Sequence, residues 1–305
     1  MAAATAATEP FRHVCGQHAW RPNNTLVMKK KEYSSHKVSV IVSTYNRPDA
    51  LEVCLRSLFC QTVLPYEIVV GDDGSGEPTR QLIEKMKAVS PVPIIHVWHE
   101  DYGFRLAMMR NKSIAATHGD YIIEMDGDIF AHPHFIEDHL HEAAPGRYVK
   151  GGRTNLGKAL TERICRSGMP TRIHYWTKGI ESKPENSIHC SWLAHLLAPR
   201  YRKHRSAALG CNMSFFKSDI IRVNGYDEFY EGWGGEDVDL GYRLQMSGLS
   251  KRYLKFAGIV YHLWHEDKYM YNKDKNIAHG YECEKRGKWR CDNGLDKYLP
   301  SADTK

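Results

Sequence analysis

The sequence lacks any apolar run that approaches the roughly 18 residues needed to cross a bilayer, which argues against a membrane-spanning protein. Residues 1–8 are rich in alanine but lack the apolar core of a secretory signal. The eight cysteines include no C-x-x-C pair, so we expect reduced, mostly structural thiols. These absences together predict a cytoplasmic protein.

Acidic residues are scarce in one segment. Between Arg147 and Arg205 there are 13 Lys or Arg but only three acids, Glu162, Glu181 and Glu185. Such an excess favours an anionic partner, either lipid headgroups or an anionic glycan acceptor, although it also suits a solvated basic face without a partner. Peripheral contact with the inner face of the plasma membrane through 147–205 is therefore one expectation. No nucleic-acid motif accompanies the charge, so no nucleic-acid partner is expected.

Hydrophobic patterning predicts an α/β fold from residue 38 onward. Four short β-branched strands, at 38–43, 67–71, 93–98 and 120–125, alternate with helices that begin at Pro48, near Pro78 and at Phe104. This alternation predicts a Rossmann-like, mostly parallel sheet with flanking helices. Further on, the sequence predicts a strand at 207–216, a helix at 234–246 and strands at 252–256 and 258–262.

The chain divides into four parts by pattern. Residues 1–36 are predicted to be poorly ordered, because they combine an alanine tract, a turn-like segment and a lysine run. Residues 37–130 form the predicted nucleotide-binding half, and 131–270 the less regular acceptor-binding and catalytic half of the same domain. Residues 271–305 are a C-terminal extension. Few clear periods occur in 147–205.

Polar clusters follow three of the predicted strands: 43–47, Asp72-Asp73 and Asp126-Gly127-Asp128. Because ligands of open α/β sheets bind beyond the carboxyl ends of the strands, these clusters are expected to share one site. The two carboxylates of Asp126 and Asp128 are hard oxygen ligands at a spacing that suits Mn²⁺ or Mg²⁺ bridging a diphosphate. The sequence therefore predicts a divalent-metal site at this edge.

A second cluster, Gly-Trp-Gly-Gly-Glu-Asp at 232–237, opens the helix predicted at 234–246. Its glycines permit close approach of the backbone to a ligand, and Trp233 offers a flat face for a sugar ring. Glu236 and Asp237 lie near the helix N-terminus, where carboxylates are favoured. Capping alone would explain one acid, so we expect a functional role for both.

Two further groups of residues are candidates for the same site. His262 and His265 follow the last predicted strand, and a neutral imidazole is a suitable ligand for Mn²⁺; His262 is preferred, but the choice between the two stays open. Arg105 and Arg110 lie on the helix before the metal strand. Each is either a two-pronged partner for a diphosphate or a solvated helix charge.

Jointly, these motifs resemble the family 2 glycosyltransferases, which have the GT-A fold. The matching stretches are 38–46, 69–75, 110–111 with 119–121, and the Asp126-Gly127-Asp128 triplet. The block at 232–237 is similar to a C-terminal part shared by β-1,4-galactosyltransferases, polypeptide N-acetylgalactosaminyltransferases and bacterial chondroitin-type polymerases. Gly71 departs from the pattern, because many members carry a larger apolar residue there, and 147–205 has no clear counterpart.

The resemblance implies a role for each matching residue. Asp73 would bind the nucleobase, expected to be uracil, and the loop that contains Ser43, Tyr45 and Arg47 would line the nucleoside. Asp126 would contact the ribose or the metal.

Asp128 would bind the metal together with His262, and Asp237 would be the general base, with Glu236 beside it. These roles imply an inverting, metal-dependent transfer from a UDP-sugar to a glycan hydroxyl. Surface polysaccharide or lipid-linked oligosaccharide synthesis is the expected context.

Two rival functions remain. A sugar nucleotidyltransferase would need a glycine-rich loop after the first strand, and residues 43–48 contain no glycine. A non-catalytic glycan- or nucleotide-binding protein on the same fold would not need Asp128, Asp237 and His262 together. Both are therefore disfavoured.

Overall fold

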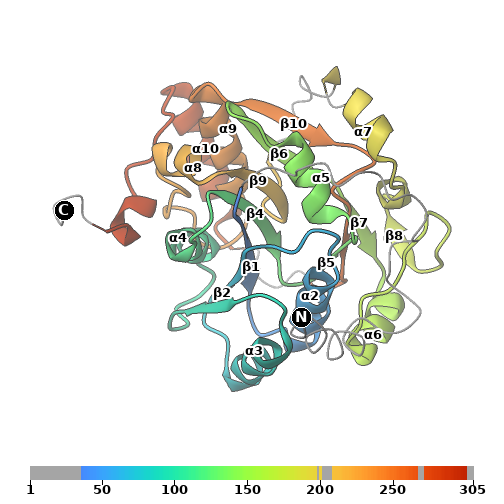
Figure 1. Cartoon of the computed structure of the whole chain (residues 1–305). Coiled ribbons are helices and arrows are strands. Elements are labelled where there is room, and N and C mark those ends of the chain that lie inside the picture. Colours follow the sequence, from blue (N-terminus) through green and yellow to red (C-terminus); the bar gives the residue numbers. More distant parts are fainter. Residues whose placement is uncertain (1–35, 198, 201–207, 267–270, 301–305) are drawn as a thin grey trace, which may run out of the picture.

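A computed structural model describes residues 36–197, 199–200, 208–266 and 271–300. The segment predicted to be poorly ordered lies outside these residues, apart from residue 36. Figure 1 shows a central sheet flanked by helices, with a second, smaller sheet beside it. The strands of the larger sheet run in the order β10-β6-β9-β4-β1-β2-β3, and those of the smaller in the order β5-β11-β7-β8.

The first part of the chain builds one side of the large sheet. Strands β3, β2, β1 and β4 are mutually parallel, as the alternating pattern predicted. Their bounds and those of the intervening helices are β1 (Val38–Thr44), α2 (Pro48–Phe59), β2 (Glu67–Asp72), α3 (Glu77–Val89), β3 (Ile94–Trp98), α4 (Leu106–Ala116) and β4 (Tyr121–Asp126). Each predicted strand and helix of this part is confirmed to within two residues.

The second part is more regular than its sequence suggested. Segment 147–205 holds five described strands and α-helices and one short 3-10 helix, although few periods were visible. The bounds from β5 to α7 are β5 (Ile129–Ala131), α5 (Phe135–Glu142), β6 (Arg147–Gly151), β7 (Arg153–Leu156), α6 (Lys158–Ser167), β8 (Ile180–Ser182), η1 (Pro184–Ser187) and α7 (Ser191–Leu197). Strands of three to five residues are too short to show a period, which is why the pattern missed them.

The remaining elements complete both sheets. β9 pairs antiparallel with both β4 and β6, and β11 joins the smaller sheet, so the two strands predicted at 252–256 and 258–262 belong to different sheets. The bounds are β9 (Asn212–Phe216), α8 (Lys217–Arg222), α9 (Glu236–Met246), β10 (Ser250–Leu254), β11 (Val260–His262), α10 (Lys273–Lys285) and η3 (Leu295–Tyr298).

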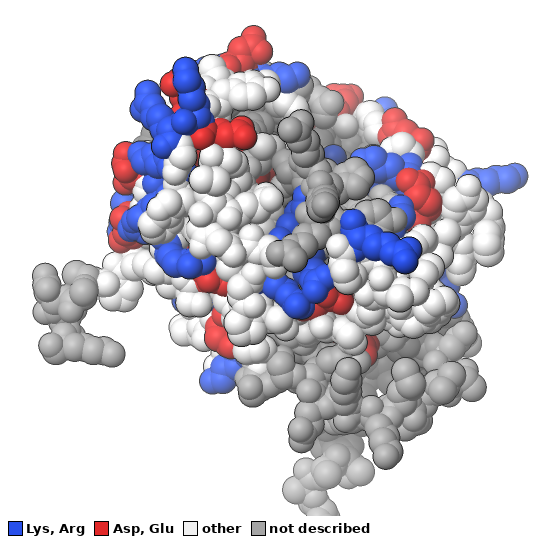
Figure 2. All heavy atoms as spheres, turned by 90° about the horizontal axis from the view of Figure 1, so that it is seen from above, with Lys and Arg blue, Asp and Glu red and all other residues white. Residues whose placement is uncertain are grey.

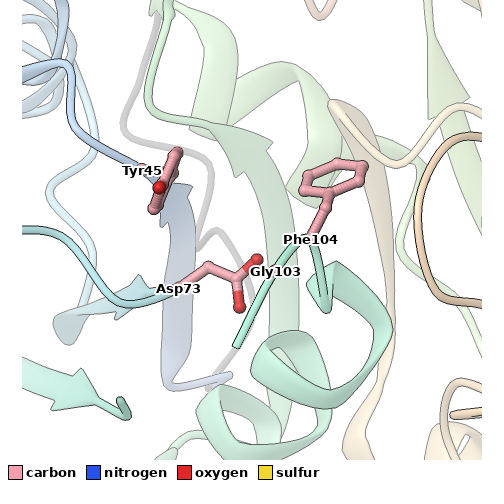
Figure 3. A pocket seen from close by; sticks show the side chains of 4 residues that line it. All are labelled: Tyr45, Asp73, Gly103 and Phe104. Atoms are coloured by element: carbon pink, nitrogen blue, oxygen red, sulfur yellow. The ribbon is translucent and has the colours of Figure 1, made fainter. Parts of the chain in front are cut away.

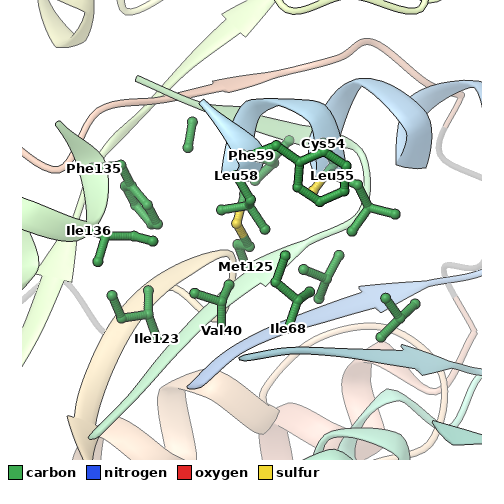
Figure 4. Packing of buried hydrophobic residues seen from close by; sticks show 14 of the residues in the cluster. Val40, Cys54, Leu55, Leu58, Phe59, Ile68, Ile123, Met125, Phe135 and Ile136 are labelled. Atoms are coloured by element: carbon green, nitrogen blue, oxygen red, sulfur yellow. The ribbon is translucent and has the colours of Figure 1, made fainter. Parts of the chain in front are cut away.

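Alternation along the strands divides the core into two layers. Val40 and Val42 face α2 and α3, whereas Ile41 faces the layer of α4, α8 and α9. Figure 4 shows Leu55 and Leu58 of α2 packed over the strands. Because parallel strands are covered on both faces, each reads as a continuous apolar run, which made them easy to predict.

Close packing explains why residue 71 is a glycine. A Cβ at this position would lie 2.2 Å from Ser113 Oγ and 3.1 Å from Met109 Cγ, because α4 lies directly on β2. The departure from the family pattern at Gly71 therefore reflects a close helix–sheet contact rather than a change in the site.

The cysteines differ in part from expectation. Six are free: Cys54, Cys165, Cys190, Cys211, Cys283 and Cys291. Cys60, in contrast, is disulfide-bonded, so the expectation of thiols fails there. Sequence spacing carries no information on such pairing. Cys15 lies outside the described residues. No helix in the described part of the chain combines the length and apolar character needed to cross a membrane.

Candidate active site

The carboxyl ends of β1, β2 and β4 bring the three predicted polar clusters together. Ser43 is the register partner of both Asp126 and Gly71, and the backbone N–H of Asp73 donates to Thr44 O at 3.0 Å. The Gly127 N–H donates to Ser43 O at 2.7 Å. Parallel pairing thus sets the acidic turn after β4 beside the loop after β1.

A pocket at this edge is lined by Tyr45, Asp73, Gly103 and Phe104. Figure 3 shows the Asp73 carboxylate between the rings of Tyr45 and Phe104. The Tyr45 hydroxyl donates to Asp101 Oδ2 at 2.8 Å, which holds the ring in place. A pocket lined by two aromatic rings and one carboxylate is suited to a planar, hydrogen-bond-donating ring.

Asp73 is itself held by a short relay. His99 Nε2 lies 2.6 Å from Asp73 Oδ1, and the backbone N–H of Arg105 donates to Asp73 Oδ2 at 2.9 Å. Lys112 Nζ lies 3.1 Å from His99 Nδ1. Because an ammonium only donates, Nδ1 must accept, and in the neutral ring the proton therefore sits on Nε2 and points at Asp73. This relay was not visible in the sequence.

The neighbouring Asp72 has a different task. Its carboxylate accepts the Ser75 N–H at 2.8 Å and lies 3.1 Å from His96 Nε2. It is fully buried, so it stabilises the turn, and Asp73 is the member of the pair that faces the pocket.

Asp128, His262 and His265 form a candidate metal centre, with one ligand atom from each within 4.8 Å of the others. His262 Nε2 and His265 Nε2 lie 3.7 and 3.3 Å from Asp128 Oδ2. Antiparallel pairing of β11 with β5 places His262 opposite Ile129, and the Leu263 N–H donates to Asp128 O at 2.9 Å. The structure therefore brings both histidines to Asp128.

The chemistry of this centre suits a divalent ion. Asp128 Oδ1 is buried and accepts no hydrogen bond among the described residues. Burial lowers the pKa of His262 to about 4, against the opposite effect of Asp128, which keeps the imidazole neutral and able to coordinate. Arg47 Nη1 approaches Asp128 Oδ2 at 3.9 Å. One carboxylate and two imidazoles are a donor set that Mn²⁺ accepts.

Asp126 is connected to the second acidic cluster through Arg110. The Arg110 guanidinium donates to Asp126 Oδ1 at 3.0 Å and to Glu236 Oε1 at 3.3 Å. Only 2% of Arg110 is exposed. Gly210 packs against its guanidinium so closely that a Cβ at position 210 would lie 2.6 Å from the guanidinium nitrogens. Arg110 is therefore not a solvated helix charge, because two carboxylates bind its guanidinium, and its contact with a diphosphate stays a prediction.

Burial shapes the charge of these acids. Burial raises the pKa of Asp126, against the effect of Arg110, and the Asp128 carboxylate raises it further. Burial likewise raises the pKa of Glu236, and the Asp237 carboxylate adds to this. Crowded carboxylates with raised pKa values are typical of sites that bind a cation or move a proton.

A third buried acid lies beneath Asp126. Glu124 Oε2 accepts the Tyr226 hydroxyl at 2.6 Å, while its Oε1 has no hydrogen-bond partner among the described residues. Burial raises the pKa of Glu124 to about 7, despite the nearby Arg110. Neither Glu124 nor Tyr226 was a sequence candidate, because a single acid inside an apolar strand carries no pattern.

The 232–237 loop is tied to the pocket and opens α9. The Gly232 N–H donates to Phe104 O at 2.9 Å. Gly235 has φ +102° at the helix N-cap, and a Cβ there would lie 2.7 Å from the Tyr230 ring, so glycine is required. Asp237 Oδ2 accepts the Gly210 N–H at 3.1 Å. Trp233 is 41% exposed, with Lys273 Nζ 5.1 Å from its ring centre.

Arg105 does not face the metal centre's acids. Its Nη2 donates to Glu100 O at 2.7 Å, and its guanidinium lies over the Tyr102 ring at 5.1 Å. The expected diphosphate contact therefore has no support from this geometry. Arg153 was not among the residues that the sequence identified. Burial lowers the pKa of its guanidinium, but the nearby Cys211, Asp126 and Asp128 have the larger, opposite effect, so the pKa is raised.

The basic segment is thus divided between two environments. Arg153 and Lys150 are turned inward, and Lys150 is buried, whereas Arg163, Arg166, Arg172, Lys178 and Lys183 are exposed. On the face seen in Figure 2, Lys and Arg side chains form separate groups among Asp and Glu. Arg202, Lys203 and Arg205 lie outside the described residues.

Comparison with known families gives two matches along the chain. The family described as glycosyl transferase family 2 matches residues 39–198, more than half of the chain. The family described as the N-terminal domain of galactosyltransferase matches residues 193–266. The first match contains the pocket and Asp128, and the second contains Glu236, Asp237 and both metal-centre histidines.

Individual relatives agree with these matches. Validoxylamine A glucosyltransferase of Streptomyces hygroscopicus subsp. limoneus is 29% identical over 79% of this chain and 55% of its own length. Chondroitin synthase of Escherichia coli is 25% identical over 76% of this chain and 35% of its own length. The chain thus spans about half or less of these two relatives.

Solved structures show the fold. The mannosyltransferase of Pyrobaculum calidifontis, in complex with GDP-Man and Mn²⁺, is 16% identical, covers 83% of this chain and 65% of its own, and has a TM-score of 0.55. S. aureus TarS in complex with UDP-GlcNAc is 18% identical, covers 86% of this chain and 69% of its own, and has a TM-score of 0.56. The expected GT-A architecture is confirmed.

Proposed function

The chain belongs to glycosyl transferase family 2, and on this premise we propose that it is an inverting, metal-dependent enzyme that moves a sugar from a UDP-sugar to a glycan hydroxyl. The observation that carries the proposal is the bridge from Asp126 through Arg110 to Glu236. It couples the metal-side acids to the acids of α9. A site with a metal centre at one end and a carboxylate pair at the other suits displacement at a carbon between them.

The nucleoside is assigned to the pocket of Tyr45, Asp73, Gly103 and Phe104. Asp73, held by His99 and the Arg105 N–H, accepts the imide N–H of uracil, while the aromatic rings enclose the base. Nucleotide sugars are present in two solved structures of the same fold, one with GDP-Man and one with UDP-GlcNAc. The carboxylate favours a base that donates at this position.

Asp128, His262 and His265 would hold Mn²⁺ or Mg²⁺, with Asp126 in a supporting role. Such an ion supplies Lewis-acid stabilisation of the diphosphate leaving group. Arg153 and Arg47 add positive charge near Asp128. Arg110 opposes the rise in the pKa of Asp126 and holds its carboxylate in position, so its proposed role is to orient the acid rather than to touch the donor.

Asp237 is the proposed general base, and Glu236 its coupled neighbour. Glu236 is engaged by Arg110, whereas only Oδ2 of Asp237 has a described hydrogen bond, from the Gly210 N–H. Asp237 takes the proton from the acceptor hydroxyl as that oxygen attacks the anomeric carbon. A single displacement inverts the configuration, so an α-linked donor gives a β-linked product. Trp233 would position a sugar ring.

The acceptor is proposed to be a glycan or lipid-linked glycan in surface polysaccharide synthesis, in a cytoplasmic enzyme. One of the relatives is a chondroitin synthase. Peripheral membrane contact through 147–205 is supported by exposed aromatic side chains among the exposed cations, with Trp176 79% and Trp192 68% exposed. Sedimentation with anionic vesicles, compared with neutral vesicles, tests this contact. If the protein is absent from both vesicle pellets, the proposed membrane contact is wrong.

A panel of nucleotide sugars tests the central proposal. Purified protein is incubated with each donor and a glycan acceptor, with Mn²⁺ or with a chelator, and nucleoside diphosphate release is measured. We expect release from one UDP-sugar that needs both the metal and the acceptor. Full activity in chelator, or an α-linked product by proton NMR of the anomeric position, would contradict it.

The two rival functions predict other outcomes. A nucleotidyltransferase would release pyrophosphate from a nucleoside triphosphate and a sugar phosphate, and a non-catalytic binder would retain the donor unchanged. The loop after β1 contains no glycine to grip a triphosphate. Both rivals are therefore weaker than transfer.

A further inference from the structure

A second cluster of metal-ligating side chains lies outside the proposed active site, where α10 meets the segment before α9. Asp227, His279 and Cys283 each present one ligand atom, and the three atoms lie within 4.8 Å of one another. His279 Nε2 lies 3.0 Å from Asp227 Oδ2 and 3.5 Å from Cys283 Sγ. None of the three takes part in the proposed transfer.

The fold aims these side chains at one point. His279 and Cys283 are four residues apart on α10, so they project from the same face of the helix. Asp227 comes from the segment between α8 and α9; its Oδ1 accepts the Phe229 N–H at 3.0 Å, which leaves Oδ2 directed at His279. The Phe229 ring stacks on the imidazole with 3.7 Å between ring centres, which fixes the ring orientation.

Two of the distances among these atoms are close to those of a tetrahedral zinc site. Bonds of about 2.0 Å to oxygen and nitrogen and about 2.3 Å to sulfur place neighbouring ligand atoms roughly 3.3 to 3.6 Å apart. The observed 3.0 and 3.5 Å therefore need only small side-chain movements. A mixed carboxylate, imidazole and thiolate set favours Zn²⁺, because the soft sulfur ligand disfavours Mg²⁺ and Mn²⁺.

We propose that Asp227, His279 and Cys283 bind Zn²⁺ at a structural site that is separate from the Asp128 centre. The fourth position is taken by water. Binding deprotonates the Cys283 thiol and releases that proton to solvent. The ion joins α10 to the segment that leads into α9, and this assignment does not depend on the proposed transfer reaction.

Zinc binding at this cluster would also affect the 232–237 loop. Asn276, one turn before His279 on α10, is fully buried and donates to Glu231 O at 3.0 Å and to Trp233 O at 3.2 Å. Zinc at the cluster would hold α10 in the register at which Asn276 supports Trp233. The ion thus stabilises the loop that carries the acceptor-side residues.

Cobalt substitution tests the site with a readout other than activity. Metal-free, reduced protein is titrated with Co²⁺, and we expect a near-ultraviolet thiolate-to-cobalt charge-transfer band that Zn²⁺ removes. Cys283→Ser should abolish the band, and His279→Gln should weaken it strongly. Cys190→Ser, at a free cysteine just before α7, is the matched control and should retain it. Asp128→Asn should also retain it, since the active-site set contains no sulfur.

Two measurements on the unaltered protein cover variants that do not fold. Zinc at 100 times its dissociation constant should raise the unfolding temperature by roughly 5 °C. Zinc should also slow alkylation of Cys283, measured by mass spectrometry, without slowing that of Cys190. No cobalt–thiolate band and equal alkylation rates with and without zinc would overturn the proposal.

Discussion

The two halves of this domain reach the same site by different routes. In residues 37–130, Ser43, Asp73 and Asp126 follow neighbouring parallel strands, so their positions result from regular connectivity. In residues 131–270, Asp237 and His262 reach the same edge from a helix and from a strand of another sheet. The comparison teaches that the positions of the candidate site residues in 37–130 depend on local strand order, whereas those in 131–270 depend on long-range packing.

Substituting Asp128 should have the largest effect. Asp128→Asn removes the charged ligand, and the metal contribution of several kcal/mol corresponds to a loss of transfer on the order of 10⁴-fold. The initial rate and its Mn²⁺ dependence are measured together. Asp120→Asn, an acid paired with His36 away from the site, is the control. A variant with normal rate and metal dependence would show that the first half does not hold the ion.

Asp237→Asn should separate the acceptor side from the donor side. We expect kcat to fall on the order of 10³-fold, because general-base catalysis is lost, while the donor KM stays within about threefold. Glu282→Gln, at an exposed acid of α10, is the control. Near-normal kcat with intact donor binding would remove Asp237 from the mechanism.

Arg110→Met tests the bridge between the halves through stability. Asp126 and Glu236 would lose their cation, and breaking such a buried pair costs about 3 to 5 kcal/mol of unfolding free energy. Urea unfolding measures the loss, with Arg80→Met, on the exposed face of α3, as control. If both variants unfold at the same urea concentration, the halves are not coupled by Arg110.

Glu124 should make stability depend on pH. Its pKa is about 7 in the folded protein against an ordinary 4.5, so the folded state holds the proton between these values. The contribution of Glu124 is therefore most favourable below about pH 4.5 and is lost as the pH rises through 7.

Relative to Glu124→Gln, the wild type should lose roughly 3 kcal/mol of unfolding free energy between pH 4.5 and 8. Urea unfolding of both proteins across this range supplies the difference. Parallel pH profiles would mean that Glu124 titrates normally.

Lys112→Met should have the smallest effect, confined to the donor side. Without Lys112, His99 is free to place its proton on Nδ1 and no longer donates to Asp73. Losing about 1 kcal/mol of hydrogen bonding should raise the donor KM roughly fivefold without changing kcat. Lys87→Met, on α3, should leave KM unchanged; an equal effect of both would refute the relay.

Much of the fold was predictable, and the reason lies in particular elements. β1 and β2 are buried on both faces and read as continuous β-branched runs, and α2 carries a clear apolar stripe. β7 and β11 have only four and three residues, so their pairing depends on contacts that no local pattern encodes. Segment 147–205 was accordingly predicted to be less regular than it is.

The candidate site divides in the same way. The sequence by itself determined that Asp73, Asp126 and Asp128 follow strands of one parallel sheet, because strand–helix alternation places their carboxyl ends at one edge. It also identified Asp237, His262 and Trp233 as candidates, through their motif.

Only the tertiary structure decided which groups meet. It brought His265 beside His262 at Asp128, assigned Arg110 to two carboxylates, turned Arg105 away, and joined Asp227 to His279 and Cys283. These contacts join residues that are distant along the chain, and the orientation of the Arg105 side chain depends on how it packs. The packing of α4, α9, α10 and the small sheet decides such contacts, and sequence spacing does not express them.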